Sequence, residues 1–386
     1  MPIYHTLGDI PPRRHITHPK EDGSLHHEQV MGNKGFSGAS SILYHLRRPT
    51  EVSAVEHVRD VTPQADPDPA LRHRHLRSAQ VPTGGSPTLD RVPLMFNGDV
   101  VLLAARPDFQ DEHFYRNGQA DEYVFVHEGA GVLQTQFGDL PFSAGHQLII
   151  PRGILHRYRL EDLPARLFVV ESRGELRWPR RYHNDQGQLL EGAPFCERSI
   201  QRPGDLRTVD RVGPHAVVIK QRDQLTRVTM DHHPMDVVGW DGYYYPWGFS
   251  VHDFEPITGM IHQPPPVHQF LQSDAFVLCN FCPRPYDFHP EAVPAPYHHS
   301  NVMTDEVLYY ASDNFMSRKG VEAGSLTLHP DGLPHGPQPG RYSSSVGKES
   351  TDELAIMVDT FRPLQVTRQA LELEDGDYFL SWRTDR

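Results

Sequence analysis

The chain contains a segment that occurs twice and carries a complete set of metal-binding side chains only in the second copy. Residues 115–122 (YRNGQADE) align without a gap with residues 299–306 (HSNVMTDE). Further on, residues 151–156 (PRGILH) align with residues 330–335 (PDGLPH). An extended apolar run follows each Asp-Glu pair. A repeat of this size predicts two copies of one β unit.

Composition also favours a β-rich fold. The chain has 35 prolines among 386 residues, and proline is excluded from helix interiors. Alternating apolar runs punctuated by glycine turns predict a small antiparallel barrel over residues ~98 to ~172. The only helix candidate is short, around residues 67–77. A second group of strands is expected at residues 276–281, 307–310, 325–329 and 354–360.

These patterns predict an all-β protein of two barrels preceded by an irregular segment of about ninety residues. We expect an N-terminal domain over residues 1–230, made of this irregular arm and a metal-free barrel. A C-terminal domain over residues 231–386 is expected to hold the metal site.

The second copy of the repeat combines His299, Glu306 and His335, whereas the first has a tyrosine in place of the leading histidine. Two histidines and a carboxylate are the ligand set of the facial triad in non-haem Fe(II) oxygenases. Asp305 and Glu306 point to opposite faces of a strand, and either could ligate; the longer reach of Glu306 favours it. Each residue alone could equally be a solvated edge or a turn cap, but their equivalent places in a repeat favour a metal site.

Several protein classes are excluded by the bulk properties. A formal net charge of −13 argues against nucleic acid as a partner. No apolar run is long enough to span a bilayer, and the N-terminus MPIYH lacks a signal pattern, so a cytoplasmic location is expected. Three cysteines are too few for a disulfide framework, and Cys279 and Cys282 are expected to be reduced thiols in or near a strand.

Two resemblances follow from these motifs. The order His-x-Asn-x(4)-Glu, followed later by Gly-x-x-His, resembles the cupin superfamily pattern. The chain as a whole resembles the homogentisate 1,2-dioxygenase family, through blocks that fall in the same order along most of its length. These blocks are VMGNKGFSG (30–38) with LYH (43–45), FYRN (114–117) with HEGAG (127–131), DVVGW (236–240) with Gly242 and YP (245–246), and His329 with His335 followed by GP (336–337).

The resemblance implies a bicupin whose Fe(II) lies in the C-terminal barrel, on His299, Glu306 and His335. It implies ring cleavage of homogentisate with O₂ to give maleylacetoacetate, a reaction of tyrosine and phenylalanine catabolism. It also implies a homo-oligomer, a trimer or a hexamer. Asn301 and His329 are then candidates to orient the substrate or the ligands, with His329 placed among the catalytic residues. Substrate-binding candidates also include Phe315 and Arg318, the latter near the acetate group.

The sequence departs from the family pattern at two of these places. Asp241 stands where better-known members carry a histidine that acts on the substrate hydroxyl, and we expect Asp241 to accept that proton. Phe315 stands where they carry a tyrosine. The alternatives are therefore the same chemistry on another para-dihydroxylated acid such as gentisate, or a metal-binding bicupin without catalytic activity.

Overall fold

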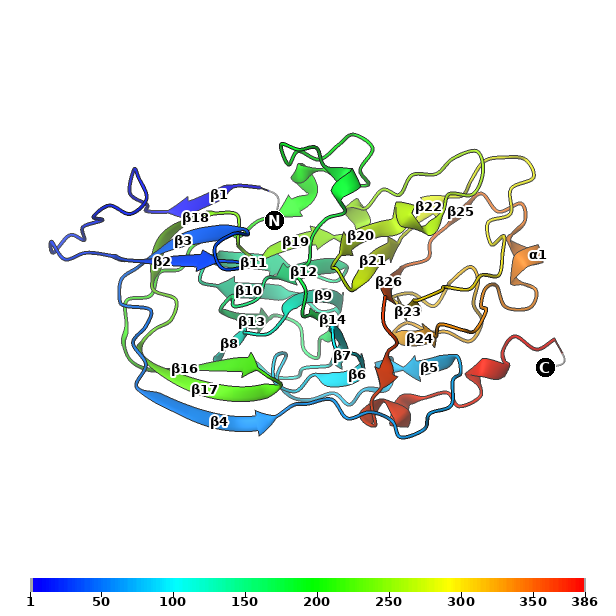
Figure 1. Ribbon diagram of the computed structural model, residues 1–386, viewed down its shortest axis with the longest axis horizontal. Helices are drawn as coiled ribbons and strands as arrows, with labels where there is room; N and C mark the ends of the chain where they lie inside the picture. Colours follow the sequence, from blue (N-terminus) through cyan, green and yellow to red (C-terminus); the bar gives the residue numbers. More distant parts are fainter. Residues whose placement is uncertain (1–2, 385–386) are drawn as a thin grey trace.

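The computed structural model describes residues 3–384, and the two residues at each end of the chain, including Met1 and Pro2 of the N-terminal motif, lie outside this range. The regular secondary structure of the described chain is mainly β-strand, and its three large sheets lie side by side along the long axis of the molecule (Figure 1). The all-β, two-barrel prediction is therefore confirmed.

The first barrel is formed by two sheets that face each other. One is seven-stranded, in the spatial order β11 (Gly138–Phe142), β10 (Gly131–Thr135), β13 (His156–Leu160), β8 (Phe114–Asn117), β16 (Val212–Gln221), β17 (Gln224–His232) and β4 (Ala54–Asp60). The other is eight-stranded, in the order β15 (Ile200–Gln201), β19 (Trp247–Ser250), β12 (His146–Ile150), β9 (Asp121–Glu128), β14 (Arg166–Ser172), β7 (Val100–Ala105), β6 (Val92–Phe96) and β27 (Gln365–Val366).

The second barrel is centred on a six-stranded sheet in the order β20 (Gln269–Gln272), β21 (Phe276–Phe281), β26 (Ala355–Thr360), β23 (Asp305–Tyr310), β24 (Ser325–His329) and β5 (Arg74–Arg77). Beside it lies the pair β22 (Arg284–Pro285) and β25 (Ser350–Thr351). A further four-stranded sheet, β1 (His5–Gly8), β18 (Val237–Gly242), β3 (Ser40–His45) and β2 (His27–Gly32), lies at the other end of the molecule.

Helical structure in the described residues is short. It comprises the α-helix α1 (Arg341–Ser345) and the 3₁₀ turns η1 (Ser78–Gln80), η2 (Arg180–Tyr182), η3 (Glu197–Ser199), η4 (Val251–Asp253), η5 (Pro265–His268), η6 (Gln369–Leu373) and η7 (Tyr378–Leu380). The helix expected over residues 67–77 is wrong, because Arg74–Arg77 pairs with β24 as an edge strand of the six-stranded sheet. The first ninety residues are also less irregular than expected, since they supply β1 to β5.

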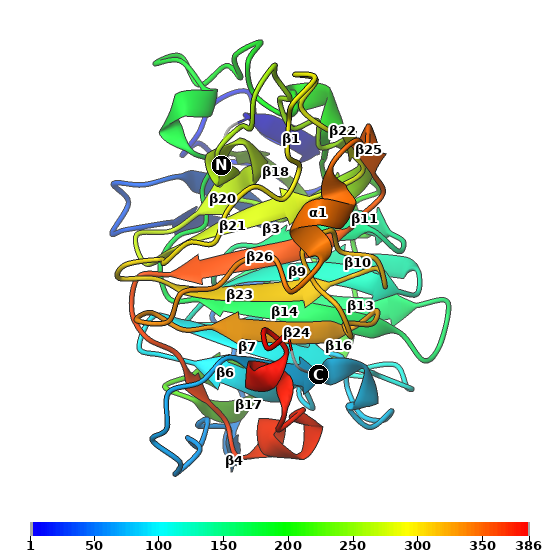
Figure 2. The same cartoon turned by 90° about the vertical axis from the view of Figure 1, so that its right-hand side faces the viewer.

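The six-stranded sheet packs face to face on the eight-stranded sheet, as the view along the long axis shows (Figure 2). Side chains alternate along β23. Tyr309 faces the first barrel, where its ring stacks on Phe168 of β14 at a centroid distance of 4.5 Å. Glu306 and Leu308 face the opposite way, into the second barrel. The apolar face of β23 therefore anchors the strand while its other face is free to build a site.

The division between residues 230 and 231 stays a prediction. Strand pairing across it is mixed: β18 and β19, which follow residue 230, pair with strands of the N-terminal part. Conversely, β5 pairs with β24 of the second barrel.

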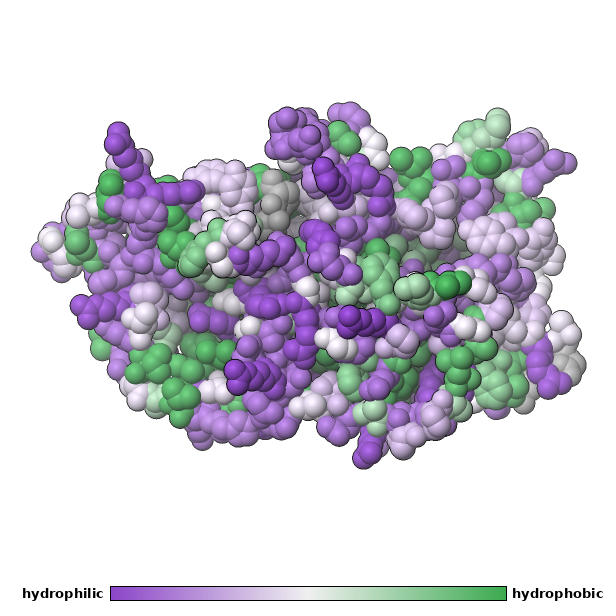
Figure 3. All heavy atoms as spheres, in the orientation of Figure 1, coloured by the Kyte–Doolittle hydropathy of each residue, from purple (hydrophilic) through white to green (hydrophobic). Residues whose placement is uncertain are grey.

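Hydrophilic side chains cover most of the face seen in Figure 3, with apolar ones scattered among them. No helix in residues 3–384 is long and apolar enough to cross a membrane. Cys279 lies in β21 and Cys282 directly after it; both are buried free thiols, as expected.

Candidate metal centre

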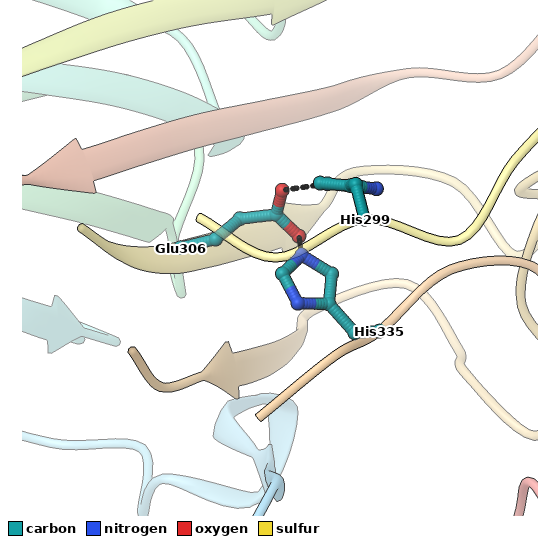
Figure 4. A group of neighbouring side chains, drawn as sticks. All are labelled: His299, Glu306 and His335. Atoms are coloured by element: carbon teal, nitrogen blue, oxygen red, sulfur yellow. Dashed lines mark ion pairs between the residues drawn. The ribbon is translucent and has the colours of Figure 1, made fainter. Parts of the chain in front are cut away.

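Three side chains meet at one end of the six-stranded sheet (Figure 4). Glu306 projects from β23, His299 from the segment before it, and His335 from the segment that follows β24. Their ligand atoms all lie within 4.8 Å of one another. His299 Nε2 is 3.6 Å from Glu306 Oε2, and His335 Nε2 is 3.4 Å from Glu306 Oε1. The three sequence-predicted ligands are thus brought together.

Backbone pairing places the two histidines. The amide of His299 donates to the carbonyl of His335 at 2.7 Å, and the amide of His335 donates back at 2.9 Å. Gly332 makes the preceding turn with a φ of +88°, a conformation that glycine adopts without strain. His335 Nδ1 lies 3.4 Å from the carbonyl of Leu333, which turns Nε2 toward Glu306.

The donor set fits a divalent metal ion. His335 Nε2 and His299 Nδ1 are buried and have no hydrogen-bond partner among the described residues. Burial alone would raise the pKa of Glu306, but its close contacts with the imidazoles of His299, His329 and His335 hold it well below its usual value. A charged carboxylate beside an imidazole nitrogen that has no partner is the arrangement that a shared cation satisfies.

Asp305 faces the other way from Glu306. Its two carboxylate oxygens accept the backbone amides of Asp331 at 2.8 Å and Leu364 at 2.7 Å. Burial raises the pKa of this carboxyl. Of the two adjacent carboxylates, Glu306 is therefore the one that points at the histidines.

His329 lies beside the candidate ligand Glu306. It sits directly opposite Glu306 on β24, and its Nδ1 is 2.7 Å from Glu306 Oε1. Its Nε2 is 3.2 Å from the hydroxyl of Tyr378. Burial, followed by the charge of Arg318, lowers the pKa of His329 well below its usual value. Because it contacts the carboxylate, His329 orients a candidate ligand; it is absent from the lining of the cavity described next.

A cavity of about 360 Å³ opens beside the cluster. Its lining includes Asn301, Phe315 and Arg318, the three substrate-binding candidates, together with His299 and Glu306. Apolar walls come from Phe281, Leu308 and Met357. This volume lies at the lower end of the ~300–1,000 Å³ range of ligand sites, which suits a single-ring molecule.

Arg318 is largely committed to the protein itself. Its Nη1 donates to the carbonyl of Gly336 at 2.8 Å, and its Nη2 lies 3.9 Å from Glu306 Oε1. The ring of Trp382 packs on the guanidinium at 5.6 Å. Arg318 therefore supplies a buried positive charge at the cavity wall.

Asp241 lies elsewhere, which corrects its expected place beside the ring hydroxyl. It belongs to β18 in the four-stranded sheet, toward the opposite end of the molecule from β23 and β24 (Figure 1). Its Oδ2 accepts hydrogen bonds from the Tyr4 hydroxyl and from Arg14, both at 2.9 Å. A proton acceptor must lie within hydrogen-bond reach of its substrate, and within one chain Asp241 does not.

Two further residues at the site were missed by sequence reasoning. His73, just before β5, packs its ring 6.1 Å from that of His335, and burial followed by the nearby His335 lowers its pKa to about 4. Asp359 lines the cavity and sits directly opposite Glu306 on β26. No local motif marks His73. The repeat could have identified Asp359, because Glu171 occupies the equivalent position opposite Glu122 in the first barrel.

The fold and site define the class as a two-barrel β protein with a His-Glu-His cluster, and comparison with known proteins identifies a family of dioxygenases. A family model described as "Homogentisate 1,2-dioxygenase N-terminal" matches residues 98–251. A protein of Saccharolobus solfataricus named "Putative dioxygenase SSO1533" is 40% identical over 387 residues, covering 100% of both chains. Homogentisate 1,2-dioxygenase of Bradyrhizobium diazoefficiens is 26% identical, over 71% of this chain and 63% of that enzyme. The chain belongs to the homogentisate 1,2-dioxygenase family.

Among solved structures, a cupin 2 conserved barrel domain protein from Leptotrichia buccalis matches 78% of this chain and 99% of its own. The identity is 8% and the TM-score is 0.34.

Proposed function

We propose that this chain is an Fe(II)-dependent dioxygenase that opens the ring of homogentisate to give maleylacetoacetate, as in tyrosine and phenylalanine catabolism. The observation that carries the proposal is the cluster of His299, Glu306 and His335, of which His299 and Glu306 line a ring-sized cavity. Family membership supports the reaction class, and homogentisate is the substrate in the names of several relatives.

Bound Fe(II) would supply the oxygen chemistry, because a facial triad leaves coordination positions open for O₂ and substrate. The residues of the chain hold and shape that site. His329 fixes the Glu306 carboxylate from one side, and the Tyr378 hydroxyl holds the other nitrogen of His329. These contacts keep Glu306 in one orientation.

The cavity wall would select an aromatic acid. Phe281, Leu308 and Met357 exclude water from one side of the ring. The positive charge of Arg318 favours a substrate with a carboxylate. Asn301 and Asp359 offer hydrogen-bonding groups to the ring hydroxyls.

The alternative substrate is gentisate, which lacks the methylene of the acetate side chain. Phe315 favours this alternative, because it lines the cavity and cannot hydrogen-bond to a substrate group. A metal-binding protein without catalytic activity is the remaining alternative.

Oxygen uptake after anaerobic loading with Fe(II) separates these possibilities. We expect consumption of O₂ with homogentisate and a product whose mass is greater by two oxygen atoms. Uptake with gentisate but not homogentisate would replace the substrate and keep the reaction class. No uptake with either acid by iron-loaded protein would refute the proposed enzyme.

The family resemblance also motivates a homo-oligomer, trimeric or hexameric, acting in the cytoplasm. Light scattering at micromolar concentration tests the assembly, and a monomeric mass would contradict it.

A further inference from the structure

The two copies of the repeat match in three dimensions, residue by residue. His156 pairs with Tyr115 across the antiparallel strands β13 and β8, and His335 pairs with His299 in an isolated antiparallel bridge. His156 Nδ1 lies 3.0 Å from the carbonyl two residues before it, as His335 Nδ1 does at 3.4 Å. The repeat therefore carries over the backbone of a metal site as well as its sequence.

The acidic residues match as well. Asp121 accepts the backbone amides of Arg152 at 2.8 Å and Leu176 at 2.9 Å, the same two contacts that Asp305 makes in the second barrel. Glu122 thereby points into the first barrel and is fully buried. The carboxylate and imidazole of a metal site are both in position there.

A side-chain cation lies at this carboxylate. Arg91 Nη1 is 2.9 Å from Glu122 Oε1 and 3.7 Å from Glu171 Oε1, and the Arg91 side chain is only 3% exposed. Its guanidinium carbon lies 5.8 Å from the centre of the Tyr115 ring. Lys220 adds a second cation, 2.6 Å from Glu171 Oε2. In the second barrel, Asp359 takes the place of Glu171, and no ion pair to it is found within residues 3–384.

We propose that the Arg91 guanidinium replaces the metal ion in the first barrel, so that this barrel holds a closed counterpart of the metal site. The positive charge that Glu122 requires is supplied by the chain itself. Two features then exclude a metal ion. Tyr115 stands in place of a ligand histidine, and the Arg91 guanidinium, about 3 Å from the Glu122 carboxylate, would repel a divalent ion bound to the same carboxylate. Because the inference concerns the first barrel alone, it is independent of the reaction in the second.

The prediction is that both obstacles must be removed to open the site. Tyr115→His alone restores three ligands but leaves the guanidinium in place, so it should bind no additional metal. Tyr115→His with Arg91→Ala restores the ligands and removes one positive charge, which a divalent ion would replace. Co²⁺ is a suitable probe, because its visible absorption reports bound ligands and its content can be measured directly.

We expect about one equivalent of Co²⁺ per chain in the parent and in Tyr115→His, and about two in the double variant. A second equivalent in Tyr115→His alone, or only one in the folded double variant, would overturn the proposal. Should Arg91→Ala prevent folding, Tyr115→His with Arg91→Gln keeps a side chain of similar length without the charge, and it too should bind two. If neither double variant folds even with Co²⁺ present, the metal does not replace the guanidinium and the proposal fails.

Discussion

The contact between the barrels predicts a large loss of stability when Phe168 is truncated. Phe168 is fully buried, and its ring stacks on Tyr309 of β23 at an interplanar angle of 4°. Truncating a buried phenylalanine to alanine costs about 3–5 kcal/mol, because apolar burial is lost and a cavity remains.

A milder change is available on the same side of β23, where the Tyr309 hydroxyl lies 2.6 Å from His127 Nδ1. Burial lowers the pKa of His127 to about 4, so at pH 7 Tyr309→Phe leaves a neutral imidazole unpaired, at about 1–3 kcal/mol.

Chemical denaturation at neutral pH, followed by far-UV circular dichroism and by fluorescence, measures both changes. Phe168→Ala should lower the free energy of unfolding more than Tyr309→Phe, because the stacked ring contributes more than the single hydrogen bond. Both probes should report one transition if the barrels unfold together. A loss below about 1 kcal/mol for Phe168→Ala would refute the view that this contact joins the barrels.

Three further outcomes follow from the sites. Burial alone would raise the pKa of Glu122, but the charges of Arg91 and His156 lower it to about 2. The stabilising effect of Glu122 is therefore present above pH ~4.5 and is lost as the pH falls toward 2. Glu122→Gln should lack this part of the acid sensitivity when denaturation is measured at each pH. Asp241→Asn should leave oxygen uptake within about twofold of the parent, and a hundredfold loss would return Asp241 to the reaction. Asp359→Asn should slow oxygen uptake while metal content stays unchanged; equal rates would remove Asp359 from the substrate site.

The strands and the ligand set could be predicted from the sequence because both depend on local patterns. Residues 276–281 and 325–329 form the expected strands, and the gapless repeat brings His299, Glu306 and His335 together. Side-chain alternation also gave a physical reason to separate Asp305 from Glu306.

The features that the sequence did not predict depend on contacts between residues far apart along the chain. Residues 74–77 become an edge strand because they pair with the free side of β24, and this pairing brings His73 to the candidate metal site. The position of Asp241 was inferred from a sequence resemblance, which carries no information on which sheet β18 joins. Arg91 was missed because it precedes β6, outside the repeated segment, and the repeat alone does not reveal a substitute cation.

The pair His335 and His156 offers the most direct test of the central claim that one barrel holds the metal. The two residues occupy equivalent positions, so each controls for the other. Purified protein loaded anaerobically with Fe(II), then freed of excess metal, should retain about one iron per chain. His335→Ala should lose the iron and oxygen uptake with homogentisate, whereas His156→Ala should keep both largely intact. Two irons in the parent, or equal losses in the two variants, would contradict the account.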